Sequence, residues 1–362
     1  MRVERLNNGL PIIHRGHFVA AGLPEDGDNI NGPSIVRLPE WVEPSRRCHP
    51  EARFYLYFAH HHGSSIRLAW SSDLLGPWHL HAPGHGVLSL RDARDADDAD
   101  DADDADDAHD EPELAIGNGI VLRGHVASPD VHLDPSRRSF VMYFHAPTRL
   151  LSGHRLGFEQ VSYVALSDDG LHFRIEPVML GYFYFRVFVV RGRHYAIANK
   201  GQLWQAPAGD EPWYAPPGFD FDSLLWNFVG NPLVEALRAE PDNIADHPRH
   251  VALRVVNGER LQCLFSSVGD APERIRFVEI DVADADPARW RACSPIVEVL
   301  APDRPWEGVG RELARSRLGA QTGVRQLRDP CLFHDDSDGG ADYLLYCGGG
   351  EEAIGLARIE LD

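Results

Sequence analysis

Five polar or charged residues occupy similar places in the chain, each near the start of an apolar segment. They are Asn31 before Gly32-Pro33, Asp130 after Ser128-Pro129, Arg186, His250, and Asp329 before Pro330. Two carboxylates, a guanidinium and an imidazole can transfer protons and hold a polar substrate when they share one pocket. We therefore take Asp130 and Asp329 as candidate catalytic residues, and Asn31, Arg186 and His250 as candidate substrate-binding residues.

A third candidate carboxylate lies in the turn Gly269-Asp-Ala-Pro-Glu-Arg-Ile275. The proline restricts the backbone just before an apolar segment begins, so the turn can present Glu273 in a fixed position. Glu273 is therefore a catalytic candidate. The alternative is that Glu273 forms only a surface ion pair with Arg274 or Arg276, which would contribute little.

The corresponding turn of the first segment reads Ala59-His-His-His-Gly63. Adjacent residues of an extended chain point to opposite faces, so at most two of these imidazoles could share a metal ion. We expect His60 and His61 to hydrogen-bond a substrate, and we assign no metal ligand. No cofactor is expected, with a calcium or other divalent ion kept as the alternative.

Three carboxylates around one pocket suit the cleavage of a glycosidic bond. One carboxylic acid gives a proton to the leaving oxygen, while an ionised carboxylate activates water or attacks the sugar. A third carboxylate can hold the two pKa values apart. Arg186 and Arg328 suit sugar hydroxyls or an anionic sugar, and aromatic residues such as Tyr184 could stack on a sugar ring.

These residues can meet only if the chain forms a ring of strands. A Tyr/Phe-rich strand follows each polar start, as in Phe54-Tyr-Leu-Tyr-Phe-Ala-His60 and Phe140-Val-Met-Tyr-Phe-His145. The pattern recurs five times, at spacings of roughly 40 to 80 residues that are typical of radial all-β arrays. The sequence therefore predicts an all-β fold, a five-bladed β-propeller, formed by residues 1–362 as one domain.

The last repeat, from Leu327 to Leu361, contains only three strands. We expect the N-terminal segment around Leu10-Pro-Ile-Ile-His14 to supply its outer strand, because this closure would remove an exposed sheet edge. Helices should be few and short. The best candidates are Pro232 to Arg238 and Trp306 to Arg317.

The chain has 362 residues, 43% of them hydrophobic, and a formal net charge of −20. Much of this charge lies in residues 91–113, which contain 13 acidic residues and two arginines. Because this tract has no hydrophobic period and repels itself, we expect it to be a solvated loop. The overall acidity argues against a nucleic-acid partner.

Five cysteines are irregularly spaced and include no Cys-x-x-Cys pair: Cys48, Cys263, Cys293, Cys331 and Cys347. This usage predicts reduced thiols in a cytoplasmic protein. The N-terminal residues lack the apolar core of a secretory signal. No run of 18 apolar residues is present, so we expect no membrane span.

The chain resembles the five-bladed β-propeller glycoside hydrolases, the superfamily that includes families 43, 117 and 32/68. The resemblance rests on Asp329-Pro330, Ser128-Pro129-Asp130, the Tyr-Leu-Tyr strands, and the segment Ser71-Ser-Asp-Leu-Leu-Gly-Pro-Trp78. It covers nearly the whole chain as architecture. It implies a carbohydrate substrate bound where the propeller axis opens.

Two positions depart from the family 43 pattern. That family places its general base at the start of the first blade, where this chain has Asn31. It places its acid, a Glu followed by Gly-Pro, on the third blade, where this chain has Arg186. The resemblance therefore implies a divergent member, with Glu273 as acid, Asp130 or Asp329 as base, and the other aspartate as modulator.

The predicted function is that of an exo-acting glycosidase on an oligosaccharide, because insertions after the first, third and fourth blades could wall a pocket. One alternative is a glycoside phosphorylase, for which Arg186, His250, Arg325 and Arg328 could bind phosphate. Another is a carbohydrate-binding propeller without catalysis, which the absence of a carboxylate at Asn31 keeps open.

Overall fold

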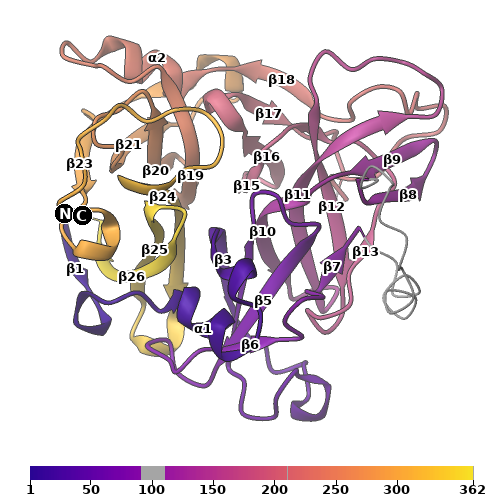
Figure 1. The fold of residues 1–362 in the computed structure, drawn as a ribbon. Coiled ribbons are helices and arrows are strands. Elements are labelled where there is room, and N and C mark those ends of the chain that lie inside the picture. Colours follow the sequence, from indigo (N-terminus) through magenta and orange to yellow (C-terminus); the bar gives the residue numbers. More distant parts are fainter. Residues whose placement is uncertain (91–110, 210, 362) are drawn as a thin grey trace.

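The structure is a computed structural model that describes residues 1–90, 111–209 and 211–361. Its strands form five hydrogen-bonded sheets arranged around a central axis (Figure 1). The predicted all-β propeller is therefore confirmed. Most of the tract predicted to be an acidic loop, residues 91–110, lies outside the described residues, and β8 begins at Glu113.

The sheets follow one another along the chain. The first contains β3 (Asn31–Arg37), β4 (Phe54–Ala59), β5 (Ser65–Ser71), β6 (His79–His81) and β7 (Leu88–Ser89). The second contains β8 (Glu113–Gly117), β9 (Ile120–Arg123), β10 (Ala127–Asp134), β11 (Ser139–Leu150), β12 (Gln160–Ser167), β13 (Arg174–Ile175) and β14 (Gly181–Tyr182). The third contains β15 (Arg186–Val190), β16 (Arg193–Ile197), β17 (Leu203–Gln205) and β18 (Asn227–Gly230).

The remaining two sheets complete the array. The fourth contains β19 (His247–Val256), β20 (Arg260–Val268), β21 (Ile275–Asp281), β22 (Arg291–Ala292) and β23 (Val297–Leu300). The fifth contains β24 (Thr322–Asp335), β25 (Ala341–Gly350) and β26 (Ala353–Glu360), together with β1 (Arg2–Arg5) and β2 (Ile13–His14) from the N-terminal end.

Each sheet shares a buried core with both of its neighbours. In β11, Phe140 and Met142 pack toward the first sheet, whereas Val141 and Tyr143 pack toward the third. Alternate side chains of a strand point to opposite faces, so one strand contributes to two cores. Burial on both faces also explains why β4 is a continuous apolar run rather than an alternating one.

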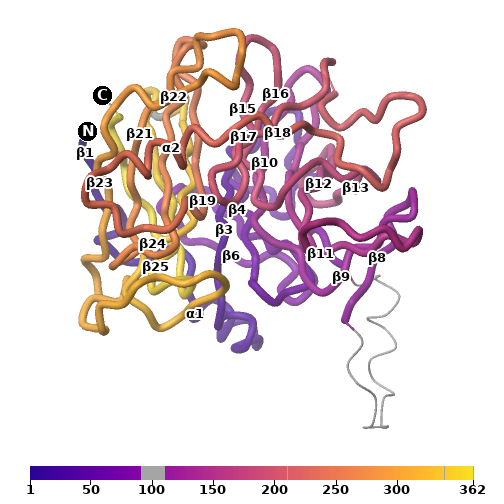
Figure 2. Tube along the Cα trace, turned by 90° about the horizontal axis from the view of Figure 1, so that it is seen from above, coloured from indigo at the N-terminus to yellow at the C-terminus, as the bar shows by residue number. Residues whose placement is uncertain are grey.

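The N-terminal strands complete the fifth sheet. Arg2 of β1 pairs with Glu360 of β26, and Ile13 of β2 pairs with Ile354 of the same strand. The predicted closure by an N-terminal strand is confirmed, although the longer pairing lies at β1 rather than near Leu10. Both chain ends consequently lie next to each other (Figures 1 and 2).

Helices are short. The α-helices are α1 (Arg15–Ala20) and α2 (Pro232–Ala239), and α2 confirms one predicted helix. The 3-10 helices are η1 (Asn7–Gly9), η2 (Pro24–Gly27), η3 (Pro44–Arg46), η4 (Asn199–Gly201), η5 (Pro287–Arg289), η6 (Pro305–Glu307) and η7 (Asp336–Asp338).

The prediction of a helix at 306–317 was wrong. Only η6 forms there, because Gly308 and Gly310 adopt φ angles of 91° and 96°, which end a right-handed helix. None of the helices in the described ranges has the length and apolar character needed to cross a membrane. The five cysteines are free thiols, as predicted.

Candidate functional site

The innermost strand of each sheet connects two cavities on the axis. The first axial cavity, at the strand starts, is lined in order by Asn31, Ser128, Tyr184, His250 and Asp329. The second axial cavity, further along the same strands, is lined by Ser34, Asp130, Arg186, Leu253 and Cys331. The innermost strands therefore run in the same direction along the axis, and their starts converge.

Bulges decide which residue of each strand reaches which cavity. The pairing register shifts near the start of β3, β10 and β19, and in the middle of the longer β24, between Arg328 and Cys331. In three of these bulges a residue with positive φ precedes a proline: Gly32 at 60°, Ser128 at 53° and Asp329 at 49°. Asp329 is thus equivalent to Ser128, and Asp130 lies two positions further on, level with Cys331.

The first axial cavity has a volume of about 20 Å³, which is room for about one water molecule. Its polar lining consists of two carboxylates, four imidazoles, two amides, a hydroxyl and a phenol. These are Asp329 and Glu351; His61, His125, His145 and His250; Asn31 and Gln160; Ser128; and Tyr184. Asn31 Oδ1, His145 Nδ1 and His250 Nε2 are buried and accept or donate no hydrogen bond among the described residues.

Asp329 is the carboxylate most tightly held at this cavity, with 1% of its surface exposed. Its Oδ2 accepts a hydrogen bond of 3.1 Å from the Gly32 N–H, and its Oδ1 lies 2.5 Å from His250 Nδ1. Burial acts to raise the pKa of Asp329, but His250, the Gly32 N–H and Arg328 outweigh it and hold this pKa well below its usual range. Asp329 is therefore ionised and orients His250, whose Nε2 remains free.

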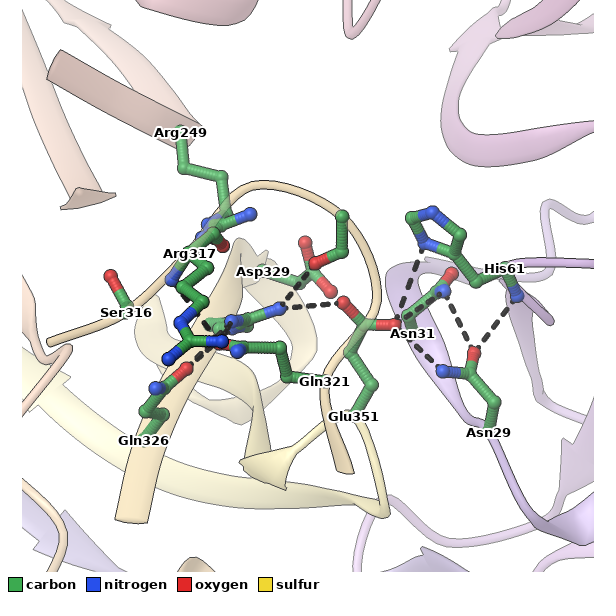
Figure 3. Close-up of polar contacts among 12 residues, drawn as sticks. Asn29, Asn31, His61, Arg249, Ser316, Arg317, Gln321, Gln326, Asp329 and Glu351 are labelled. Atoms are coloured by element: carbon green, nitrogen blue, oxygen red, sulfur yellow. Dashed lines mark hydrogen bonds and ion pairs between the residues drawn. The ribbon is translucent and has the colours of Figure 1, made fainter. Parts of the chain in front are cut away.

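Glu351 is the second carboxylate of the cavity, and the sequence analysis missed it. It lies in the turn between β25 and β26 (Figure 3). Its Oε2 accepts hydrogen bonds from Asn29 at 2.7 Å and Asn31 at 3.3 Å, and lies 3.6 Å from His61 Nδ1. This turn corresponds to the one that carries Glu273 in the fourth sheet, so a comparison of all such turns could have found it.

Arg328 donates a hydrogen bond to Glu351 but does not itself line the cavity. Its side chain is fully buried and donates to Glu351 Oε1 at 2.9 Å. It also donates to the side-chain oxygens of Gln321, at 2.7 Å, and Gln326, at 2.6 Å (Figure 3). The predicted substrate-binding role of Arg328 is thus replaced by a positioning role.

Glu273 does not line the first axial cavity either. It is fully buried, with Oε1 2.9 Å from Arg249 Nε and Oε2 3.1 Å from Arg328 Nε. Arg274 pairs instead with Asp270, at 3.1 Å. Glu273 is therefore neither the exposed acid nor the surface ion pair considered from the sequence. It neutralises two buried arginines.

Asp130 and Arg186 line the second axial cavity and are not brought together with Asp329. Asp130 Oδ2 accepts hydrogen bonds from the Val187 N–H at 2.8 Å and from His132 Nε2 at 2.9 Å. Burial acts to raise the pKa of Asp130, but His132 and Arg186 lower it. We expected Asp130 to meet Asp329, but Asp130 follows its proline whereas Asp329 precedes its own. The two aspartates therefore lie at different depths along the axis.

Three of the four histidines that line the first axial cavity have a pKa below the usual value, which favours their neutral forms. Burial is the main cause that lowers the pKa of His61 and His145, and it lowers that of His125 to about 4. His60 does not line the cavity, since its Nδ1 accepts the His62 N–H at 3.1 Å. Among the described residues, no group of three or more His, Cys, Asp or Glu side chains is placed to hold a metal ion.

The segment 308–321, which follows η6, covers the buried arginines beside the cavity. Arg249 donates to the carbonyl of Arg317, and Arg328 donates to that of Gly319 at 3.1 Å. Ser316 Oγ also donates to the carbonyl of Ser267 at 3.0 Å. These contacts fix the segment over one side of the site.

Comparison with solved structures supports the propeller fold. A glycosyl hydrolase from Bacteroides ovatus gives a TM-score of 0.59 at 11% identity, covering 99% of this chain and 93% of that one. A structure from the GH130 family of mannoside phosphorylases and glycoside hydrolases gives 0.57 at 11% identity, covering 99% and 94%. A thermostable family-43 glycoside hydrolase gives 0.54 at 14% identity, covering 92% and 90%.

No established protein-family profile matches the chain. At the level of sequence, it is 30% identical over 338 residues to the uncharacterized protein R118 of Acanthamoeba polyphaga mimivirus, covering 91% of this chain and 83% of the viral protein. The chain therefore belongs to the same family as this viral protein and has the propeller fold of the glycoside hydrolases that it resembles in structure.

Proposed function

We propose that this protein is a glycoside hydrolase, built as a five-bladed propeller, whose reaction takes place at the first axial cavity. The observation that carries the proposal is that Glu351 and the Asp329–His250 pair line one cavity with room for about one water molecule. Hydrolysis needs a proton donor, a carboxylate and a water within reach of one bond. The five sheets, each sharing cores with two neighbours, support the blade count.

Each residue has a proposed role. Ionised Asp329 holds His250 so that its free Nε2 donates a proton to the leaving oxygen. Glu351, fixed by Asn29, Asn31 and Arg328, acts as the carboxylate that activates water or attacks the sugar carbon. This scheme replaces Glu273 as acid and Asp130 as base, because neither side chain lines the cavity.

The cavity lining favours hydrolysis over phosphorolysis. A phosphorylase needs cationic groups for phosphate, but no Arg or Lys lines the first axial cavity among the described residues. Of the four residues proposed to bind phosphate, namely Arg186, His250, Arg325 and Arg328, only His250 lines this cavity. Two carboxylates would repel phosphate from the same space.

The small volume of the cavity also supports action at a chain end. A sugar ring is larger than one water molecule, so the ring would lie above the cavity, with only the reacting bond reaching it. The 308–321 segment contacts the buried Arg249 and Arg328, and we propose that it limits access from that side, so that an oligosaccharide enters end-on. Exo action predicts that monosaccharides are released from the start of a time course.

Aryl glycosides provide the test. We expect turnover to fall by about 10²- to 10⁴-fold in Glu351→Gln and His250→Gln, as for other acid–base groups. Asp335→Asn is the matched control, because Asp335 is a buried carboxylate on β24 that pairs with Arg37, away from the cavity. Turnover that needs added phosphate would contradict hydrolysis, and sugar binding without any turnover would indicate a binding propeller.

The leaving group separates the two roles. A dinitrophenyl leaving group departs without a proton, so it should restore most of the rate lost in His250→Gln. The same substrate should not restore Glu351→Gln, since the carboxylate acts on the sugar carbon or on water. Rescue of Glu351→Gln instead would exchange the two assignments.

A further inference from the structure

The second axial cavity lies two to three residues further along the innermost strands and has a volume of about 220 Å³. Apolar side chains line part of it, namely Ile35, Val131, Ala252, Leu253 and Leu332, although polar atoms supply the larger share of its exposed lining. The charged or basic side chains that line it are Asp130, His132 and Arg186, and the thiol of Cys331 lines it as well. A concave space that combines apolar side chains with a few placed polar groups is the usual form of a small-molecule site.

Arg186 makes no close ion pair with a described carboxylate, although its charge lowers the pKa of Asp130 in the same cavity. Only 7% of its surface is exposed. Its Nη1 donates to the carbonyl oxygens of Ser128 at 3.0 Å and Phe185 at 3.3 Å, which are neutral acceptors. Its Nε and Nη2 donate to no described residue, and it forms no ion pair with a described carboxylate. A buried charge in this state is costly unless an anion reaches it.

Asp130, the nearest candidate, is already engaged. Its Oδ2 accepts from His132 and from the Val187 N–H. The Asp130–His132 pair thus balances its own charge on one side of the cavity and leaves the guanidinium of Arg186 to attract a second anion. The geometry of an arginine suits a carboxylate, which can accept two parallel hydrogen bonds.

A neighbouring hollow extends the apolar space. It has a volume of about 290 Å³, shares His132 and Val187 with the second axial cavity, and is lined by Tyr143, Phe188 and Trp213. A flat apolar group leaving the axis between β10 and β15 would meet these rings. The two spaces together suit a ligand with one charged end and one aromatic end.

We propose that the second axial cavity binds a small aromatic carboxylate, with its carboxylate on Arg186 and its ring against Leu253, Leu332 and the Trp213 hollow. This site is separate from the glycosidase proposal, because the two cavities share no lining residue. Its ligand class is argued from one buried cation and from the apolar and aromatic side chains of the neighbouring hollow.

Calorimetric titration of the full chain with phenylacetate tests this site, and the neutral phenylacetamide is the matched probe. We expect phenylacetate to bind at least about tenfold more tightly than phenylacetamide, because only the acid forms charge-assisted hydrogen bonds. Arg186→Gln should remove that preference. Leu253→Trp, which leaves Arg186 in place and fills the cavity, should weaken both probes about tenfold or more.

Asp329→Asn, in the first axial cavity, should leave phenylacetate binding within about twofold of the parent. If Arg186→Gln does not fold, Arg186→Lys and Leu253→Trp still test the site, since lysine keeps the charge but loses the paired geometry. Absence of phenylacetate binding to the parent would overturn the proposal. Equal affinity for the two probes, or binding unchanged in Leu253→Trp, would overturn it as well.

Discussion

Two buried arginines lie near the two axial cavities, and their partners differ. Arg328, which lies behind Glu351 of the first axial cavity, contacts Glu273 and Glu351 and has no exposed surface. Arg186, at the second, donates only to backbone carbonyl oxygens. Burial alone therefore does not reveal what an arginine does. One surrounded by carboxylates positions other groups, and one without them is available to bind an anion.

The largest expected effect compares the loss of each cation. Arg328→Met would leave Glu273 and Glu351 buried without their shared counter-ion, so we expect unfolding free energy to fall by about 3–5 kcal/mol. Arg186→Met leaves only carbonyl groups without a donor, so the expected loss is about 1–3 kcal/mol. Urea denaturation of both variants measures the difference.

Arg311→Met is the exposed control for this pair of variants. Arg311 pairs with Glu352 at 3.2 Å on the surface, and we expect a change of about 0.2–1 kcal/mol. Equal losses of unfolding free energy in Arg328→Met and Arg186→Met would contradict the proposed difference between the two arginines.

The next prediction concerns Asn31, which stands where the resemblance to family 43 led us to expect a carboxylate. Asn31 donates to Asn29 at 2.9 Å and to Glu351 at 3.3 Å. Asn31→Asp would set a second carboxylate against Glu351, and neighbouring like charges raise the pKa of one of them. We expect kcat/KM for an aryl glycoside to fall about 10- to 100-fold at neutral pH and to recover partly as pH rises.

Asn118→Asp makes the same change at an exposed amide that donates to Pro177, and it should keep the parental pH profile. A gain of turnover in Asn31→Asp would show instead that the site lacks a general base and that a carboxylate at position 31 can supply it.

The contributions of the two axial cavities to stability should also change with pH in opposite directions. At the first axial cavity the pKa of His125 is lowered to about 4, mainly by burial, so the folded state disfavours the proton. Its contribution to stability is present above pH 6.5 and is lost as pH falls from 6.5 toward 4. At the second cavity burial lowers the pKa of His132, but Asp130 outweighs burial and raises it. That contribution is present below pH 6.5 and is lost as pH rises through the raised pKa.

Chemical denaturation across this pH range separates the two histidines. His125→Gln should reduce the acid loss of stability, and His132→Gln should reduce the loss on the alkaline side. If both variants change the pH dependence of the unfolding free energy in the same direction, the predicted difference between the two axial cavities is wrong.

The smallest expected effect tests the equivalence of the bulges. Ser128 has φ 53° without being a glycine, so Ser128→Gly should leave stability unchanged or raise it by about 1 kcal/mol or less. At the equivalent Gly32, a Cβ atom would lie 3.0 Å from Ser128 Cα, so Gly32→Ala should destabilise by about 1–3 kcal/mol. Thermal unfolding compares them, and a stabilised Gly32→Ala would refute the tight packing of the two bulges.

Local sequence features were sufficient to predict the propeller fold and the convergence of the strand starts. Continuous apolar runs such as Phe54–Ala59 indicate strands that are buried on both faces of their sheet. The Gly-Pro, Ser-Pro and Asp-Pro pairs indicate the bulges of the innermost strands. Asn31, His250 and Asp329, which the convergence of the strands brings together, line one cavity, and His61 reaches the same cavity from the turn between β4 and β5.

The remaining errors arose from register and from distant partners. Asp130 and Asp329 flank their prolines on opposite sides, and only the bulged hydrogen-bond pairing shows that this shift separates them. Glu273 and Glu351 occupy similar turns, yet the first is enclosed by Arg249 and Arg328 and the second faces the cavity. Which glutamate is enclosed depends on side chains from other strands, so the turn sequences alone could not distinguish them.

The pairing of β1 with β26 has a consequence for how the chain is made. Because Arg2 pairs with Glu360, a ribosome must synthesise nearly the whole chain before β1 can find its partner. Until then β26 is missing, the ring stays open, and the apolar faces of the first and last sheets lack their shared core. A circular permutant that joins the adjacent ends by a short linker would turn this latest contact into a local hairpin and should fold faster.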